Sequence, residues 1–456
     1  PGLIALLKRC KAEGILLGVC TNKLESLSIR LLEALGMRAY FGAIVGPEYP
    51  TPMSDPTTGE ALETALLAGI AALEQPDRGE ATSNGNGPED TGTGPRIDGG
   101  GLTGLRSLFQ AQCLSRHLDL VARRLRTAGR GYYTIGSAGH ESNGAVALAT
   151  RSTDPALLHY RSGAFYVARS LAASSPTDPV DDVLAGMMAH DDEPISGGRH
   201  KVFGHPDTSV IPQTSTIASH LPRAVGVAFA IGRATKLGQP LRWPSDAVTV
   251  CSFGDASANH STALGAINAA CNLAYQGLPV PLLLVCEDNG IGISVPTPSG
   301  WIEAAFRDRP GLRYVTVDGE DADALMATTG ELVDWIRRWR RPAFLHLRTV
   351  RYLGHAGTDV ELGYRGSEEI RSAFGRDPIL GTARALVQRG VTPAKLADEY
   401  GRHRRYVESR AEMRQRVGRE LTSAREVMAP VAPRPEPPVV ARPTELRRQR
   451  RTSDSG

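Results

Sequence analysis

Residues 102–428 alternate between two hydrophobic patterns. Short continuous apolar runs, such as 247–250 and 280–285, are bounded by turn residues, which is typical of buried β-strands. Between such runs the apolar positions follow the helical period, so that they line one face of an α-helix. Strands that alternate with helices favour a mostly parallel sheet flanked by helices. The expected fold class is therefore α/β.

The amino-terminal residues 1–46 carry a smaller version of the same pattern. Its apolar positions have the helical period in two stretches and form short apolar runs in two others. We expect a helix over 3–13, a strand over 15–20, a helix over 24–35 and a strand over 43–45.

Two stretches of the chain lack any such pattern. Residues 74–101 are rich in Gly, Pro, Asp, Asn and Ser, a composition that cannot bury a core and that predicts a flexible linker. The last stretch is rich in Pro and Arg and is expected to be disordered. We divide the chain into a partial α/β fragment (1–73), the linker (74–101), a large α/β domain (102–428) and the tail (429–456).

Composition narrows the classes of function. The chain has 456 residues and a net charge of +3, too small to argue for a nucleic-acid partner. No stretch approaches the roughly 20 apolar residues that span a bilayer, and the amino end lacks a leader pattern. The six Cys show no CxxC spacing and predict buried thiols. We expect a protein of the bacterial cytoplasm and, since it starts at Pro1 rather than Met, a fragment of a longer reading frame.

Two acid-amide clusters follow the apolar runs. The first contains Gly254 and Asp255, and the second contains Asn289 and Gly290. Asp and Asn at strand ends are hard oxygen donors, and Gly lets a ligand approach the backbone, as a Mg²⁺-bound diphosphate requires. Gly-Asp and Asp-Asn-Gly are also common turn sequences, so either cluster alone is more typical of a structural turn.

Together the clusters resemble the motif of thiamine diphosphate-binding proteins, in which Gly-Asp-Gly opens the cofactor site and Asn, or Asp-Asn, closes it. Two features depart from that motif. Its third Gly is Ala256 here, and 34 positions separate Asp255 from Asn289, a few more than usual. We assign the surplus to the loop around 275–279, on the far side of the sheet, where it leaves the site intact.

Three further segments extend the resemblance to the alpha subunits of 2-oxo acid dehydrogenases. His-Tyr-Arg-Ser-Gly contains Tyr160 and Arg161, which match the pair that holds the cofactor phosphates. Arg-Tyr-Leu-Gly-His ends at His355, which matches a His over the cofactor. A small polar run contains Ser215 and Ile217, which match contacts to the cofactor rings. Each segment alone is more typical of a surface turn, a loop His or a helix start, but all occur in the family's order.

The resemblance implies specific roles. Asp255, Asn289 and the carbonyl of Ile291 would hold Mg²⁺, and the helix starting near Ser257 would direct its positive end at the phosphates. His355 would be the catalytic residue, in contact with the diphosphate and the substrate. The expected cofactor-binding residues are Tyr160, Arg161, Ser215, Ile217, Gly254, Asp255, Ala256, Ser257, Asn289, Ile291 and His355.

Two positions near these motifs are not expected to have a leading role. They are His140 and Ala356. His140 lies in a segment, 133–141, that matches the family's opening site loop less well, so a direct role is the less favoured reading of it. Ala356 replaces the Ser that follows the His in kinase-regulated relatives. A phosphorylation switch is therefore not expected at this position.

The resemblance also implies that the chain holds half of an active site. In the family, the Glu that activates the cofactor comes from a pyrimidine-binding domain of a beta subunit, and the residues after Met428 are too few for that domain. We expect thiamine diphosphate- and Mg²⁺-dependent oxidative decarboxylation of a small 2-oxo acid, with a beta subunit, in an α2β2 assembly. The acyl group would pass to a lipoyl-bearing acyltransferase.

The substrate and the class stay open at this stage. The sequences of residues 133–141 and 197–199 resemble branched-chain enzymes more closely and favour a branched-chain substrate. The alternative within the class is the alpha subunit of a pyruvate or acetoin dehydrogenase. A noncatalytic fragment or scaffold is the alternative from another class. Neither a nucleic acid nor a membrane is expected as a partner.

Residues 18–41 resemble part of a haloacid dehalogenase-type phosphatase. In that family the position of Thr21 binds the transferring phosphoryl group. The nucleophilic Asp and the metal-binding acidic residues of that family are not matched, and phosphoryl transfer requires them. We expect an inert remnant rather than an active phosphatase.

Overall fold

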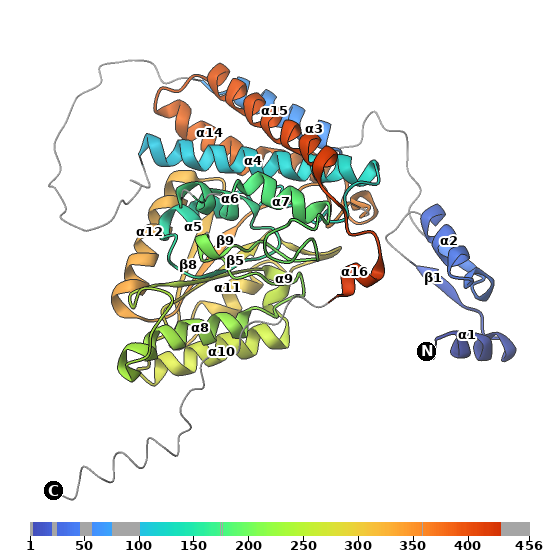
Figure 1. The fold of residues 1–456 in the computed structure, drawn as a ribbon, viewed down its shortest axis with the longest axis horizontal. Coiled ribbons are helices and arrows are strands. Elements are labelled where there is room, and N and C mark those ends of the chain that lie inside the picture. Colours follow the sequence, from blue (N-terminus) through green and yellow to red (C-terminus); the bar gives the residue numbers. More distant parts are fainter. Residues whose placement is uncertain are drawn as a thin grey trace, which may run out of the picture. The chain divides into compact units, whose positions relative to one another are not determined.

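A five-stranded parallel sheet forms the centre of the large domain (Figure 1). The computed structural model describes residues 3–20, 25–45, 57–74, 101–173, 175, 177–357 and 359–429. The strand order is β3-β4-β5-β9-β8, and every neighbouring pair is parallel. This confirms the α/β class. The strands are β3 (Ala156–Leu157), β4 (Thr249–Gly254), β5 (Leu282–Asp288), β8 (Arg313–Asp318) and β9 (Ala343–Arg348).

The central strands β4 and β5 are buried on both faces, which explains their continuous apolar sequences. Both strands extend beyond the predicted runs and include part of the polar motifs. Gly254 ends β4 and pairs with Glu287 of β5, which in turn pairs with Leu347 of β9. Asp255 therefore follows directly on the end of β4, and Asp288 ends β5.

Helices cover both faces of the sheet (Figure 1). Alternate strand residues belong to different hydrophobic clusters: Val250 and Val285 to one, and Cys251 and Cys286 to the other. The first cluster includes residues of α4 (Leu102–Thr127), α5 (Asn143–Ala149), α6 (Gly163–Ala172), α7 (Pro179–Met187), α12 (Ala322–Trp339), α14 (Pro378–Gln388) and α15 (Pro393–Val417). The second includes residues of α8 (Leu221–Ala234), α10 (Ser261–Tyr275) and α11 (Trp301–Phe306).

Helix α4 contains a buried cation that fixes a loop near the sheet edge. Arg116 has no exposed surface; it donates to Glu141 Oε1 at 2.5 Å and to Asp377 Oδ2 at 2.9 Å. Burial alone would lower the pKa of this guanidinium, but the two carboxylates outweigh it and raise the pKa. Because the backbone N–H of Gly139 donates to Glu141 at 2.7 Å, the ion pair also fixes the loop that carries His140.

Helix α3 (Gly59–Ala71) packs on the large domain. Leu66 and Ile70 are buried in the same cluster as α4, and Glu63 pairs with Arg404 of α15. The sequence analysis placed these residues in the first fragment. Their apolar face is nevertheless buried against the large domain, which a boundary based on composition does not anticipate.

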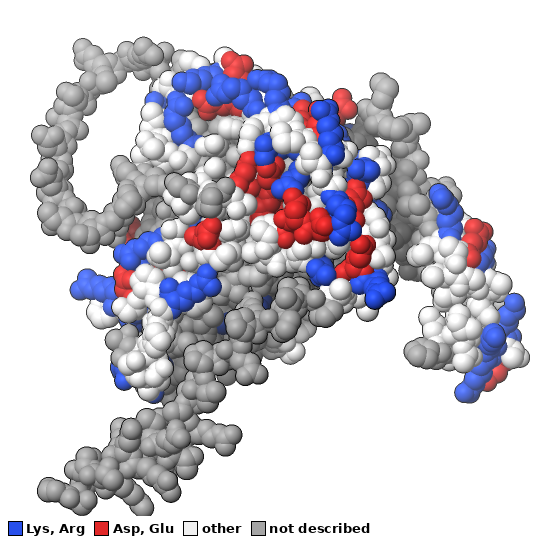
Figure 2. All heavy atoms as spheres, in the orientation of Figure 1, with Lys and Arg blue, Asp and Glu red and all other residues white. Residues whose placement is uncertain are grey.

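Ion pairs connect helix α15 with neighbouring segments at the surface. Arg410 of α15 pairs with Asp181 of α7, and Arg414 of α15 with Asp192 at 2.5 Å. Figure 2 shows basic and acidic side chains mixed on this face rather than separated by sign. Such exposed pairs contribute little stability each, typically below about 1 kcal/mol.

The amino-terminal residues form the four predicted elements. They are α1 (Leu3–Ala12), β1 (Gly18–Cys20), α2 (Glu25–Ala34) and β2 (Ala43–Val45), and the two strands pair in parallel. Thr21, residues 75–100 of the predicted linker and residues 430–456 of the tail lie outside the described residues. The chain divides into two units after Glu420; the second contains α16 (Ala424–Met428), whose first turn has a capping box formed by Ser423 and Glu426.

The free thiols agree with the expected burial in most cases. Cys113, Cys251, Cys271 and Cys286 are buried, and Cys10 is half-buried. Within the described residues, no helix has both the length and the hydropathy that crossing a membrane requires.

Candidate active site

Most of the predicted site residues of the large domain lie on segments that follow its strands; Ser215 and Ile217 instead precede α8. Tyr160 and Arg161 follow β3, Asp255 follows β4, Asn289 follows β5, and the segment to His355 follows β9. Since these strands are parallel, their carboxyl ends lie at one edge of the sheet, the usual position of ligand sites in α/β folds. The loop between α10 and β5, which was assigned the surplus length, precedes β5 and lies at the opposite edge.

Asp255, Asn289 and Ile291, here called the acidic cluster, lie on the segments that directly follow the neighbouring strands β4 and β5. The Asp255 side chain is 2% exposed and accepts a hydrogen bond from the hydroxyl of Thr297. Burial raises the pKa of Asp255, while the Thr297 hydroxyl and the backbone N–H of Asn289 oppose the rise. Among the described residues, no Lys or Arg pairs with this carboxylate. A buried carboxylate without a cation favours a positively charged ligand.

Ala256, the departure from the Gly-Asp-Gly motif, is accommodated by a Gly on the facing hairpin. That hairpin consists of β6 (Ile291–Gly292) and β7 (Val295–Pro296). A Cβ added at Gly292 would lie 2.4 Å from the Cβ of Ala256, a distance that real side chains do not adopt. The methyl group of Ala256 thus occupies the space that Gly292 leaves open, and the turn is retained.

The helix predicted to start near Ser257 differs from the prediction. A short helix, α9 (Asp255–Ala258), starts directly after β4, and α10 starts only at Ser261 with His260 as its cap. The chain bends at Asn259 and His260 between them. Ser257 is buried inside the short helix rather than at the first turn of the long one, and four residues provide only a weak dipole.

Tyr160, Arg161 and His355, here called the basic cluster, come together from distant parts of the chain. Arg161 is 2% exposed; it donates to the carbonyl of Gly136 at 2.6 Å and to the carbonyl of His355 at 3.0 Å. Its guanidinium carbon lies 5.2 Å from the ring centre of Tyr160. Among the described residues, no carboxylate pairs with Arg161.

The tautomer of His355 follows from its contact with Arg161. Nη2 of Arg161 lies 3.1 Å from Nδ1 of His355 and can only donate, so Nδ1 is the acceptor. In the neutral ring the hydrogen is then on Nε2. The backbone N–H of His355 donates to Asp359 Oδ2 at 2.6 Å, which fixes the loop. His355 would therefore present Nε2–H as a hydrogen-bond donor.

Ser215 and Ile217 are less closely tied to the two clusters. The Ser215 hydroxyl lies 2.9 Å from Nε2 of His200, and Ile217 is 40% exposed on the same loop. A cavity connects this region with the basic cluster, because His200 and Tyr160 both line it. Its other lining residues are Ser115, Leu118, Asp119, Tyr133, Ile135, Ser137, Gly163, Asp182, Val183, Gly186, Met187, Lys201, Val202 and Phe203.

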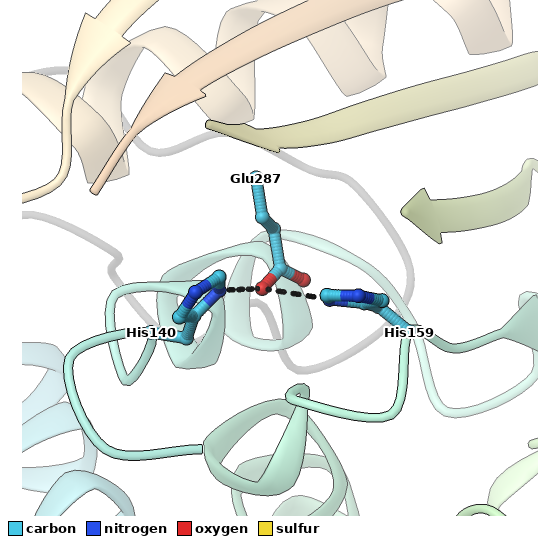
Figure 3. A group of neighbouring side chains, drawn as sticks. All are labelled: His140, His159 and Glu287. Carbon is cyan, nitrogen blue, oxygen red and sulfur yellow. Dashed lines mark hydrogen bonds and ion pairs between the residues drawn. The ribbon is translucent and has the colours of Figure 1, made fainter. Parts of the chain in front are cut away.

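A buried polar network, which was not predicted from the sequence, lies at the centre of this sheet edge. Figure 3 shows the carboxylate of Glu287 between the rings of His140 and His159. Glu287 Oε2 lies 2.7 Å from His140 Nδ1 and 3.6 Å from His159 Nδ1. Glu287 also accepts hydrogen bonds from Ser162 at 2.7 Å and from Asn143 at 3.4 Å.

The protonation of this network follows from burial and contact. Burial lowers the pKa of His140 to about 4, although its contact with Glu287 opposes the change. Burial alone would raise the pKa of Glu287, but the hydrogen bond with His140 and the nearby ring of His159 outweigh it and lower the pKa well below the ordinary value. Near neutral pH the network therefore contains an ionised carboxylate and a neutral His140.

Strained backbone conformations occur on three loops of the site. Ala218, Ile293 and Leu353 have φ values of 61°, 57° and 63°, which non-Gly residues rarely adopt. They lie on the loop of Ser215, on the hairpin of Ile291 and just before His355. Such strain is often found where a ligand must be held in a fixed geometry.

Comparison with known proteins agrees with this geometry. The family described as "Dehydrogenase E1 component" matches residues 110–413. The chain is 27% identical to the 2-oxoisovalerate dehydrogenase subunit alpha of Bacillus subtilis over 64% of this chain and 83% of that subunit. It is 23% identical to the mitochondrial 2-oxoisovalerate dehydrogenase subunit alpha of Mus musculus over 58% of this chain and 56% of that subunit.

A further similarity is more local. The chain is 30% identical to the 2-oxoisovalerate dehydrogenase subunit alpha 2, mitochondrial, of Arabidopsis thaliana over 37% of this chain and 33% of that subunit. The family match does not reach residues 1–46, so it gives no support to their resemblance to a phosphatase. Because the match covers about two thirds of the chain and includes both clusters, the chain belongs to the dehydrogenase E1 component family.

Proposed function

We propose that this chain is the alpha subunit of a thiamine diphosphate- and Mg²⁺-dependent 2-oxo acid dehydrogenase component. The observation that carries the proposal is a pair of unbalanced buried charges at one sheet edge. Asp255 and Arg161 are each 2% exposed, and neither has an oppositely charged side chain as a partner among the described residues. Burying a charge without a partner is costly, so both positions favour a bound ligand of opposite charge.

A metal-bound diphosphate has the charges that both clusters lack. Asp255, Asn289 and the carbonyl of Ile291 would hold Mg²⁺ through oxygen atoms, the donors that this ion prefers. Arg161, Tyr160 and the Nε2–H of His355 would donate to phosphate oxygens. The turn Gly254–Ser257 would line the same site, and Ser215 and Ile217 would contact the cofactor rings.

The cofactor, when bound, supplies the electron sink for decarboxylation of a 2-oxo acid. The protein's own residues bind and orient it. Arg161 holds Nδ1 of His355 as an acceptor, so the hydrogen of the neutral ring is on Nε2, which would donate to a cofactor or substrate oxygen. His355 is therefore proposed as the catalytic residue of this chain.

The substrate proposed is a branched-chain 2-oxo acid, in particular 2-oxoisovalerate. Two features support this choice: the similarity to 2-oxoisovalerate dehydrogenase alpha subunits and the cavity beside Tyr160. The cavity wall includes the aliphatic and aromatic side chains of Leu118, Ile135, Val183 and Phe203, which suit a small apolar group. Pyruvate, which is shorter, would fill less of it.

A beta subunit is proposed as the partner that completes the site. The hairpin and the helix next to the acidic cluster expose the apolar side chains of Ile293, Val295 and Trp301, which are 47%, 67% and 46% exposed. Exposed apolar side chains near a site are typical of a protein interface. The partner would supply the Glu that activates the cofactor, and a lipoyl-bearing acyltransferase would accept the acyl group.

Calorimetric titration tests this function directly. Thiamine diphosphate and Mg²⁺ are titrated into the full chain, alone and co-expressed with a beta subunit of the same family. We expect tight, Mg²⁺-dependent binding with the partner and oxidation of 2-oxoisovalerate in preference to pyruvate. A preference for pyruvate would contradict the proposed substrate but not the proposed class of enzyme. No binding under either condition would favour a noncatalytic fragment and overturn the proposal.

A further inference from the structure

Glu287 is a buried carboxylate that several side chains contact at once. Neither His140 nor Glu287 has exposed surface. Ser162 donates to one carboxylate oxygen at 2.7 Å, and the other lies 2.7 Å from Nδ1 of His140. Since a carboxylate only accepts, Nδ1 of His140 carries a hydrogen and donates it.

The other ring nitrogen of His140 faces a proposed metal ligand. Nε2 of His140 lies 2.9 Å from Nδ2 of Asn289. The orientation of this amide is fixed independently, because the backbone N–H of Ile291 donates to Oδ1 of Asn289 at 3.1 Å. Nδ2 therefore faces His140 and donates, and Nε2 must accept. Both contacts require the same neutral tautomer of His140.

We propose that His140, held by Glu287, is a positioning residue that fixes the Asn289 amide with Oδ1 on the side of Ile291, ready to bind the cation. His140 itself would not touch the metal. Groups that hydrogen-bond to a metal ligand commonly set its orientation in this way. The inference rests on the proposed Mg²⁺ site and adds a role for a residue outside that site.

The same carboxylate also supports the basic cluster. Ser162, which donates to Glu287, follows Arg161 in the chain, and Asn143 donates to the Arg161 carbonyl at 3.1 Å. Glu287 thus connects the loop that carries Asn289 with the loop that carries Arg161. Both loops keep their relative positions through one buried side chain.

A metal ion bound by His140, His159 and Glu287 is the competing interpretation of this cluster. Their donor atoms lie within 4.8 Å of one another. The distance of 2.7 Å between His140 Nδ1 and Glu287 Oε2 is that of a direct hydrogen bond, and Nε2 of His140 is occupied by Asn289. The observed contacts therefore favour a hydrogen-bonded network.

Metal affinity is the quantity that separates a positioning role from a purely structural one. Mg²⁺ is titrated into the full chain with its beta partner at saturating thiamine diphosphate. We expect His140→Phe to weaken Mg²⁺ binding about 10- to 100-fold, as is typical for residues behind a metal ligand. His140→Gln, whose amide oxygen can accept from Asn289, should recover most of the affinity. His117→Phe is the matched control, because His117 is also buried but contacts Tyr400, and it should leave Mg²⁺ binding unchanged.

A double-mutant cycle with Asn289→Ala completes the test. Once Asn289 is absent, His140→Phe should change Mg²⁺ affinity by less than about twofold, because the two residues act through one contact. Equal losses in both backgrounds would overturn the proposal. If His140→Phe does not fold, Glu287→Gln, which removes the constraint on the tautomer, is expected to weaken Mg²⁺ binding in the same way.

Three other results would count against the inference in distinguishable ways. If the wild type binds Mg²⁺ and cofactor while His140→Phe binds them equally well, the positioning role fails and the proposed function stands. If the wild type binds neither, both fail. Binding of Zn²⁺ without cofactor, lost in His159→Ala, would assign the cluster to a metal centre and overturn the proposal.

Discussion

The acidic and basic clusters differ in how the chain builds them. The acidic cluster lies within one stretch of sequence, from Asp255 to Ile291, that begins directly after β4 and includes the adjacent strand β5. The basic cluster joins Arg161 to His355, which are 194 positions apart. The first is a local feature of a strand-helix-strand unit, and the second exists only in the completed fold. Among the described residues, neither Asp255 nor Arg161 pairs with an opposite charge, so their proximity to one sheet edge favours a ligand that carries both signs.

Removing the carboxylate of the acidic cluster should have the largest effect. Asp255→Ala is expected to abolish Mg²⁺-dependent retention of thiamine diphosphate, because it removes the charge that would bind the cation. Retention is measured by cofactor content after gel filtration with Mg²⁺. Asp318→Asn is the control, since that carboxylate ends β8 and pairs with Arg348 at 2.7 Å instead. Unchanged retention in Asp255→Ala would show that the acidic cluster does not hold the metal.

Asp119 is a buried carboxyl group beside the basic cluster, and its contribution to the stability of the chain should vary with pH. Asp119 accepts from the backbone N–H of Ser137 at 2.6 Å, next to Gly136, whose carbonyl accepts from Arg161. Burial raises the pKa of Asp119 from 3.8 to about 7, so the folded state holds a proton that the unfolded state releases. This contribution to stability is complete below the unfolded pKa and is lost as the pH rises toward the folded pKa.

Urea unfolding at several pH values measures that contribution. The free energy of unfolding of the wild type relative to Asp119→Asn should fall by roughly 4 kcal/mol between about pH 4 and pH 7. Comparison with the variant cancels the titration of other groups. A difference that stays constant over this range would contradict the raised pKa.

The packing of Gly292 against Ala256 tests the geometry of the acidic cluster. Gly292→Ala should destabilise the chain by about 1–3 kcal/mol, because its Cβ would overlap that of Ala256. Ala256→Gly in the same chain should restore stability, and thermal unfolding of the four variants gives the coupling. Additive effects would mean that the two positions do not share one space.

The smallest expected effect concerns the shape of the cation in the basic cluster. Arg161→Lys keeps the charge but loses the planar fork that reaches Gly136 and His355. We expect about a tenfold weaker affinity for thiamine diphosphate at fixed Mg²⁺, measured by calorimetry. Equal affinities would show that charge alone is sufficient at this position.

The sequence predicted the acidic cluster because its parts are local. Two apolar runs that end in Gly-Asp and Asp-Asn place Asp255 and Asn289 at neighbouring strand ends once the strands pair in parallel. The same reasoning did not give the start of the helix near Ser257. Helical period identifies a helix but not the bend at Asn259 and His260 that divides it into α9 and α10.

The buried network could not be predicted in the same way. Glu287 lies in the predicted motif, yet a carboxylate beside a strand end is usually solvated, and its partners His140 and Ser162 are more than a hundred positions away in the sequence. Only the tertiary structure brings them together. The accommodation of Ala256 could not be predicted for a related reason. Gly292, which leaves space for its methyl group, lies on a hairpin that contacts α9 only in the folded chain.

The contacts of Glu287 also have a consequence for how the chain folds. They join segments around residues 140, 162 and 287, so their separation in sequence is large and we expect them to form late in folding. A partly folded chain would therefore have neither the fixed Asn289 nor the fixed Arg161. The cofactor would bind the native state alone and raise its stability by mass action, rather than guide the search for it. Refolding rates should accordingly be independent of thiamine diphosphate, while unfolding should slow as its concentration rises.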